Sequence, residues 1–283
     1  MERSIYPCLW FDGNAKEAAT FYSSVFSNSK ITTDTPIVVN FSLNGQKFMG
    51  LNGGPHFKPN PSISLFVICE TQTEIDDAWE KLSEGGEILM PLNKYEWSEK
   101  YGWLQDRFGI SWQLSYGKLQ DVGQKFAPTL MFTQKQAGKA EEAIQFYTSI
   151  FKDSSVMGIL RYTSGDHDVE GTVKHAQFRL GKDVFMAMDS SMAHKFSFNE
   201  GISFVVECEN QEEIDYFWNK FTAKGEESMC GWLKDQYGVS WQIIPAILGN
   251  LMADPLKSQN VMDALLKMKK LNINELVQAY ERG

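Results

Sequence analysis

Two glutamines mark the positions of this chain where side chains are best placed to bind a small molecule. Gln113 and Gln242 each end a Gly-[Ile/Val]-Ser-Trp-Gln segment that is typical of a β-strand. Alternate side chains of a strand face opposite sides, so each Trp should enter a core while each Gln faces a cleft. Amide, hydroxyl and aromatic side chains that converge in a cleft suit a small, partly aromatic ligand.

The same alternation assigns other side chains to the cleft walls. In the strand 6–11, Leu9 and Phe11 share the core face, whereas Tyr6 and Trp10 face the other way. A slip of one residue would reverse every face. The predicted ligand-binding residues are Tyr6, Trp10, Asn52, Ser64, Phe66, Trp103, Gln113, His175, Asp189, Cys230, Trp232 and Gln242.

Few residues are candidates for catalysis, and no catalytic residue is assigned. His175 lies on a predicted strand, where a lone histidine is more often a structural group than a catalyst. Cys230 stands where the first half of the chain has Tyr101, and no base or positive field that would form a thiolate is visible nearby. Inert packing is therefore favoured over a reactive thiol. Asp106 and Asp235 precede glycine turns, which favours a turn-capping role.

The elements that must position these side chains occur twice. WLQDRFGISWQL at 103–114 returns as WLKDQYGVSWQI at 232–243, and AKEAATFYSSVF at 15–26 returns as AEEAIQFYTSIF at 140–151. Two segments repeated in the same order indicate a duplicated domain. Each half is typical of two βαβββ units, with an Asn44-Gly45 hairpin turn and a helix capped by Thr73 in the first. We predict domains at 1–116 and 126–246, joined by a short polar linker.

The pattern changes after Pro245 to that of a helical tail at 247–283. Asp254 followed by Pro255 predicts a helix start, and apolar residues at helical spacing from Val261 to Tyr280 predict two short helices. We expect this tail to dock either on one half of the same chain or on a second subunit. The second alternative predicts a homodimer.

Composition and charge argue against several classes of partner. The 283 residues carry a net charge of −9 and no basic stripe, which disfavours nucleic acid and anionic lipid as partners. No secretory signal and no apolar run of membrane-spanning length occur, so we expect a soluble, cytoplasmic protein with no membrane partner. The four cysteines lack CxxC spacing, which argues against a zinc cluster or a disulfide framework.

Paired βαβββ units with a D-x-[FY]-G turn before the last strand resemble the vicinal oxygen chelate superfamily, which includes glyoxalase I, extradiol dioxygenases and bleomycin-binding proteins. More narrowly, LWFDGNAKEAATFYSSVF, NGGPHF, CGWLKDQYGVSWQIIP and the tail are similar to its PhnB-like branch, also labelled demethylubiquinone methyltransferase-like. The resemblance implies an α+β fold of tandem glyoxalase-like domains, each of paired βαβββ units, with a C-terminal helical tail.

In metal-dependent members of that superfamily, side chains on the opening and closing strands hold a divalent ion. The matching positions of the first half carry Tyr6, Ser64, Gly50 or Asn52, and Gln113. In the second half only Asp189 is a credible ligand, so the resemblance implies no tightly bound metal and no cofactor. The alternative is a glyoxalase-like or dioxygenase-like enzyme that uses a weakly held divalent ion through Asp189 and His175.

The methyltransferase label of the branch finds no support in the residues. A methyl-donor site of the Rossmann kind needs a glycine-rich turn that opens a helix, but Gly53-Gly54 runs into Pro55 and Pro59. The small-molecule-binding prediction has a second rival besides the metal-dependent enzyme, in which the second domain and the tail serve mainly for assembly. If a ligand binds, the aromatic-rich first cleft is favoured over the second.

Overall fold

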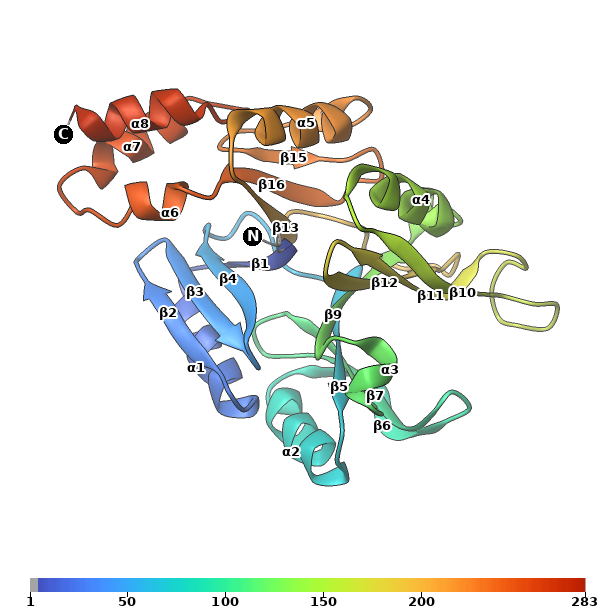
Figure 1. The fold of residues 1–283 in the computed structure, drawn as a ribbon. Coiled ribbons are helices and arrows are strands. Elements are labelled where there is room, and N and C mark those ends of the chain that lie inside the picture. Colours follow the sequence, from blue (N-terminus) through green and yellow to red (C-terminus); the bar gives the residue numbers. More distant parts are fainter. Residues whose placement is uncertain (1–4, 283) are drawn as a thin grey trace. The chain divides into compact units, whose positions relative to one another are not determined.

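The computed structural model describes residues 5–282, which form four consecutive βαβββ modules and a helical tail (Figure 1). Module 1 contains β1 (Ile5–Phe11), α1 (Ala15–Val25), β2 (Lys30–Asp34), β3 (Val38–Leu43) and β4 (Gln46–Asn52). Module 2 contains β5 (Ile63–Cys69), α2 (Gln72–Ser83), β6 (Glu87–Tyr95), β7 (Ser98–Gln105) and β8 (Ser111–Tyr116). The two βαβββ units predicted for the first half are confirmed.

The second half repeats this order of elements. Module 3 contains β9 (Phe126–Phe132), α4 (Ala140–Ile150), β10 (Ser155–Arg161), β11 (Val173–Leu180) and β12 (Asp183–Asp189). Module 4 contains β13 (Ile202–Cys208), α5 (Gln211–Thr222), β14 (Glu226–Glu227), β15 (Trp232–Lys234) and β16 (Ser240–Pro245). The linker between modules 2 and 3 forms a short helix, α3 (Leu119–Val122).

The chain forms two compact units. In one of them, a strand of the first sequence repeat pairs with a strand of the second. The unit Tyr6–Ile202 holds modules 1 to 3, and the other unit is built on Ser203–Gly283. Modules 2 and 3 share one eight-stranded sheet of order β10-β11-β12-β9-β5-β8-β7-β6, in which β5 is antiparallel to β9. The linker at 117–125 therefore separates two sequence repeats, whereas this sheet continues from one repeat into the next.

Modules 1 and 4 arrange their own strands in the orders β1-β4-β3-β2 and β14-β15-β16-β13. In each, the first strand is parallel to the last, as the pairs Cys8 with Met49 and Ser203 with Ser240 show. Parallel neighbours require a crossover connection, and α1 and α5 lie within those connections. Asn44 and Gly45 both have positive φ, 48° and 81°, which confirms the predicted hairpin turn.

Two hydrogen bonds between side chains and backbone amides, close to those of a capping box, explain where α2 begins. The Thr71 hydroxyl accepts a hydrogen bond from the Glu74 amide (3.1 Å), and the Glu74 carboxylate accepts one from the Glu70 amide (2.7 Å). The predicted cap at Thr73 is wrong by two residues, because Thr71 has the extended backbone that an N-cap requires.

Aromatic side chains fill the two cores that the sequence assigned to tryptophans. Trp112 is fully buried, with its ring 5.2 Å from that of Tyr22 and 5.4 Å from that of Phe26. Trp241 stacks on Phe221 of α5 at 4.6 Å. Burial of such large apolar surfaces dominates the stability of cores of this kind, and both predicted core positions are confirmed.

The tail docks on module 4, which confirms one of its two predicted partners. The Met268 and Lys269 carbonyls accept hydrogen bonds from the amides of Cys230 (2.7 Å) and Gly231 (2.8 Å). Leu271 is fully buried beside Gly231. The tail thus completes the core of module 4.

The tail contains α6 (Leu248–Leu251), α7 (Ser258–Leu265) and α8 (Ile273–Glu281). The two helices predicted between Val261 and Tyr280 are confirmed as α7 and α8, and α6 was not predicted. Asp254 does not cap α7, whose N-cap is Lys257. Its carboxylate instead accepts a hydrogen bond from the Leu256 amide in the preceding turn (3.0 Å). Within the described residues, no helix combines the length and the apolar character that a membrane span requires.

Candidate functional site

The eight-stranded sheet of modules 2 and 3 has a face covered by helices and an opposite face, which we call the inner face. α2 packs on β7 and β8, and α4 packs on β11 and β12. Side chains that alternate away from these helices lie on the inner face, and they include Ser64, Phe66, Gln113 and Thr129.

Three polar side chains of module 2 form a hydrogen-bonded chain on the inner face. The Tyr101 hydroxyl donates to Gln113 Oε1 (2.7 Å), and Gln113 Nε2 donates to Ser64 Oγ (2.7 Å). All three side chains are buried. Burial raises the pKa of the Tyr101 hydroxyl, which keeps it protonated as a donor at neutral pH. These two hydrogen bonds therefore fix the Gln113 amide. The predicted orientation of Gln113 away from Trp112 is confirmed.

Thr129 of β9 adds a hydroxyl that has no hydrogen-bond partner within residues 5–282. Thr129 is 4% exposed and lies directly opposite Ser64, so the two side chains are cross-strand neighbours. Nearby, the indole N–H of Trp103 donates to Ser111 Oγ (2.7 Å). The inner face thus presents paired polar groups beside one buried, unpaired hydroxyl.

Apolar side chains border this polar group. Phe66 and Trp103 are half-buried, and the Phe66 ring lies 6.4 Å from that of Tyr101. Farther along β5, side chains of α3 join an apolar cluster made of Ile68, Leu119, Val122, Ala127, Val184 and Met186, with Phe66 at its margin. The linker, predicted as a polar spacer, therefore fills one end of the inner face. The structure brings together four predicted ligand residues, namely Ser64, Phe66, Trp103 and Gln113.

Asn52 and Asp189 do not line a cleft, which corrects the prediction for both. The Asn52 Oδ1 accepts a hydrogen bond from the Ala15 amide at the start of α1 (2.9 Å). The Asp189 carboxylate accepts from the amides of Gly138 (2.8 Å), Ala140 (3.0 Å) and Val173 (3.0 Å). Alternation turns both side chains to the helix-covered side of their strands, so they hold helix starts in place. Burial raises the pKa of Asp189.

His175 lies away from the polar chain, on β11. With Gln177 and Met157 it lines a pocket of about 450 Å³ that Asp121 also borders. Desolvation by the surrounding side chains lowers the pKa of His175, although the residue keeps an exposed surface. Asp189 does not line this pocket, and its two carboxylate oxygens are occupied by backbone amides, so the predicted His175 and Asp189 metal pair has no support in the geometry.

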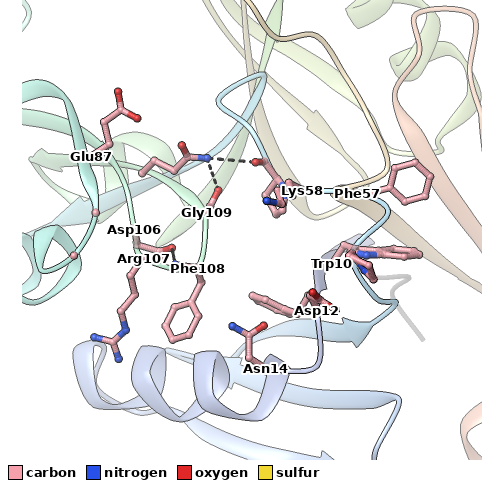
Figure 2. A pocket seen from close by; sticks show the side chains of 16 residues that line it. Trp10, Asp12, Asn14, Phe57, Lys58, Glu87, Asp106, Arg107, Phe108 and Gly109 are labelled. Carbon is pink, nitrogen blue, oxygen red and sulfur yellow. Dashed lines mark hydrogen bonds between the residues drawn. The ribbon is translucent and has the colours of Figure 1, made fainter.

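Tyr6 and Trp10 lie on β1, outside the inner face of the shared sheet. The Lys47 ammonium sits 4.1 Å from the centre of the buried Tyr6 ring. The Trp10 indole N–H donates to the Gly54 carbonyl (2.7 Å), and the ring meets Phe57 edge-on at 5.0 Å. Trp10 lines a separate pocket of about 600 Å³ (Figure 2).

Module 4 carries the second set of predicted residues. Gln242 Nε2 donates to Ser203 Oγ (3.0 Å), which repeats the pair found in module 2. Trp232 is half-buried on β15. Cys230 is half-buried with a left-handed backbone (φ 62°), and burial raises the pKa of its thiol. A raised thiol pKa disfavours the thiolate, so the geometry supports the inert interpretation of Cys230.

Asp106 and Asp235 have the predicted turn-capping role and a second role that was not predicted. Oδ1 of Asp106 accepts hydrogen bonds from the amides of Phe108 (2.8 Å) and Ile110 (3.0 Å). Oδ2 of each Asp accepts from the indole of the Trp six residues later, 2.8 Å for Trp112 and 2.9 Å for Trp241. Burial raises the pKa of Asp106. The repeated spacing D-x₅-W was the signal for this tie.

The side chains of the inner face do not suit a tightly held metal ion. Within the described part of the chain, no three His, Cys, Asp or Glu side chains gather at one point. Ser64, Gln113 and Thr129 offer hydroxyl and amide oxygens, which bind divalent cations weakly compared with imidazole and carboxylate.

Tyr101 and Thr129 belong to this site but are not among the residues predicted to bind a ligand. Tyr101 alternates with Trp103 on β7, so its place on the same face was available from the spacing. The signal for Thr129 was weaker, because its proximity to Ser64 depends on the pairing of β5 with β9 across the two repeats.

Known families and structures show what the chain resembles. The family model described as 3-demethylubiquinone-9 3-methyltransferase matches residues 3–115 and 124–244. A PhnB protein from Bacillus cereus is 41% identical over 39% of this chain and 96% of its own, with a TM-score of 0.37. Glyoxalase I from Zea mays is 11% identical over 85% of this chain and 92% of its own, with a TM-score of 0.57, which shows a shared fold. No curated protein matches the chain.

Proposed function

Because the chain belongs to the 3-demethylubiquinone-9 3-methyltransferase family, with two copies in tandem on the glyoxalase fold, we propose that it binds a small, partly aromatic molecule on the inner face without a tightly bound metal. The buried hydroxyl of Thr129 carries this proposal. Its neighbours Ser64 and Gln113 are already hydrogen-bonded to each other, so a ligand is the natural partner for the remaining hydroxyl. A buried polar group without a partner costs about 1–3 kcal/mol, and a bound polar atom would recover much of that.

The apolar surroundings favour a ring on the same ligand. Phe66 and Trp103 keep exposed surface on the inner face, and both flank the Ser64 and Gln113 pair in the strand register. Aromatic rings beside a few fixed polar groups are typical of small-molecule sites. The side chains of α3 limit the space at the far end, which favours a compact ligand.

The residues of this chain give no basis for methyl transfer, the activity in the family's name. The glycine pair that could have been read as a donor-binding turn has another role, because a Cβ on Gly53 would lie 2.1 Å from the Trp10 ring. Gly53 is therefore required for packing, and no helix follows it.

The test is a tryptophan-fluorescence screen of phenols, aromatic carboxylates and phosphonates with wild type and Thr129→Val. The Val variant removes the unpaired hydroxyl at nearly constant shape, so it should unfold at higher urea concentration and yet bind the best compound about tenfold more weakly. Ser203→Ala, at the position of module 4 that matches Ser64, is the control and should leave that affinity unchanged. A stabilised Val variant with unchanged affinity would place the ligand elsewhere and overturn the proposal.

Metal content is a second test of the same proposal. Protein purified without chelator should contain well under one equivalent of zinc, manganese, nickel or iron, and added chelator should not lower its melting temperature. A stoichiometric metal ion whose removal lowers the melting temperature would favour the metal-dependent enzyme instead.

A further inference from the structure

A pocket of about 600 Å³ lies apart from the inner face, between the β1–α1 turn and the turn that joins β7 to β8 (Figure 2). Residues of the segment 55–59 and of the segment 85–87 complete its walls. A volume of this size falls within the range of about 300–1,000 Å³ that small-molecule sites occupy. None of the four residues grouped on the inner face lines it.

The walls of this pocket are held rigidly. Gln105 Nε2 donates to the carbonyls of Gly109 (2.7 Å) and Pro59 (3.3 Å), which ties the β7–β8 turn to the 55–59 segment (Figure 2). A Cβ on Gly86 would lie 2.3 Å from the Gln105 carbonyl oxygen, so the backbones also pack closely there. A site that is formed in advance loses little entropy when it binds a ligand.

Aromatic side chains supply the apolar part of the lining. The Phe108 ring lies 6.5 Å from that of Phe11 in an edge-on arrangement, and both residues line the pocket. Trp10 lines it as well, fixed by its hydrogen bond to the Gly54 carbonyl. These rings are suited to the flat or bulky apolar body of a small ligand.

Charged side chains of both signs border the same pocket. Asp12 and Lys58 both line it (Figure 2). Both are exposed, and neither takes part in an ion pair within residues 5–282. Glu87 and the buried Asp106 add two further carboxylates, and Arg107 adds a guanidinium that sits 4.1 Å from the centre of the Phe21 ring. A purely anionic ligand would meet three carboxylates and a purely cationic ligand would meet two cations, so the lining favours a molecule with both charges.

We propose that this pocket binds a small zwitterion with an aromatic or bulky apolar body, of the α-amino acid class. Asp12 takes the ammonium group, Lys58 takes the carboxylate, and the rings of Phe11 and Phe108 contact the apolar body. This site is independent of the ligand proposed for the inner face, because the two share no residue.

Calorimetric titration of the full chain with three matched probes tests the assignment: L-phenylalanine, 3-phenylpropionate, which lacks the ammonium group, and phenethylamine, which lacks the carboxylate. Phenylalanine should bind about fivefold more tightly than either analogue, the size expected for a partly solvated ion pair. Lys58→Ala should reduce phenylalanine to the affinity of phenethylamine, and Asp12→Asn should reduce it to that of 3-phenylpropionate. Both residues are exposed, so both variants should fold.

Two control variants show whether the measured binding belongs to this pocket. Lys94→Ala removes an exposed lysine that pairs with Glu99 on the β6–β7 hairpin, and it should leave all three affinities unchanged. Thr129→Val should do the same, which distinguishes this pocket from the inner face. Absence of binding at millimolar phenylalanine, equal affinities for the three probes, or binding that neither Lys58→Ala nor Asp12→Asn weakens would each overturn the proposal.

Discussion

Modules 2 and 4 carry the same closing motif, yet different structures surround it. The shared contacts are the Asp-to-Trp ties of Asp106 with Trp112 and Asp235 with Trp241, and the amide-to-hydroxyl pairs of Gln113 with Ser64 and Gln242 with Ser203. In module 2 the neighbouring hairpin, β6 with β7, is long and brings Tyr101 onto Gln113. In module 4, β14 and β15 are short, and the tail packs there instead.

This difference teaches that the motif is a scaffold and that its neighbours decide the chemistry. Both copies bury a Trp and orient a Gln in the same way, because the strand alternation and the Asp tie are local. The third polar group, Tyr101 in one copy, depends on the length of a hairpin outside the motif. Substitutions in the motif should therefore act alike in both modules, and substitutions around it should not.

The largest expected effect tests the shared scaffold. Trp112→Ala and Trp241→Ala should each lower the free energy of unfolding by about 3–5 kcal/mol, because each leaves a cavity and a buried carboxylate without its indole donor. Urea unfolding followed by circular dichroism measures both. A cost below about 1 kcal/mol for one of the two would show that the copies are not equivalent scaffolds.

The second prediction compares the tail, which packs beside β15 of module 4, with the β6 strand of module 2. Leu271→Ala should cost about 2–4 kcal/mol, because this fully buried tail residue fills the core beside β15. Ile88→Ala, on the β6 strand of module 2, should cost less than about 0.5 kcal/mol, because its side chain is 52% exposed. Thermal unfolding of the two variants compares them, and equal losses would contradict the assigned role of the tail.

The third prediction extends the comparison to modules 1 and 3, in which Asn52 and Asp189 hold the starts of α1 and α4. Asp189→Asn gives module 3 the residue type that module 1 has at this place. One carboxylate oxygen is then replaced by an NH₂ group, a donor that faces backbone amides, so the free energy of unfolding should fall by about 1–3 kcal/mol. Because burial raises the folded-state pKa of Asp189 above its unfolded value, wild type gains stability from this group as the pH falls through the folded pKa. The variant lacks that gain.

The difference in unfolding free energy between wild type and Asp189→Asn should therefore widen from neutral pH to about pH 4. Urea titrations at several pH values measure it. Asn52→Ala is the companion variant in module 1, where the side chain at this position does not titrate, and its cost should stay constant over the same range. A pH-independent difference for Asp189→Asn would contradict the burial of a charged carboxylate.

The smallest expected effects concern Tyr101 and Cys230, which occupy equivalent positions in the two repeats. Tyr101→Phe should cost about 1 kcal/mol, because Gln113 Oε1 loses its donor. Cys230→Gly should raise stability by about 0.5 kcal/mol, because glycine relieves the left-handed backbone at φ 62° at some cost in chain entropy. Differential scanning calorimetry should show a lower melting temperature for Tyr101→Phe and a higher one for Cys230→Gly. A lower melting temperature for Cys230→Gly would show that packing of the Cys230 side chain stabilises the fold.

Local patterns in the sequence were sufficient for much of the fold. The repeated segments established the duplication, and the periodicities located the βαβββ modules to within a few residues. The opposite faces of Trp112 and Gln113 followed from strand alternation alone. These features depend on residues close in the chain, where backbone geometry sets the spacing of side chains.

Only the tertiary structure decided which modules pair and therefore which side chains meet. β5 pairs with β9 of the other repeat, and this pairing alone sets Thr129 opposite Ser64. Strand edges present the same backbone N–H and C=O groups whatever their sequence, so local patterns do not specify a distant partner. Strand alternation already turns Asn52 and Asp189 to the helix-covered side of their strands, but the amides that bind them come from the starts of α1 and α4, which only the folded chain brings to them.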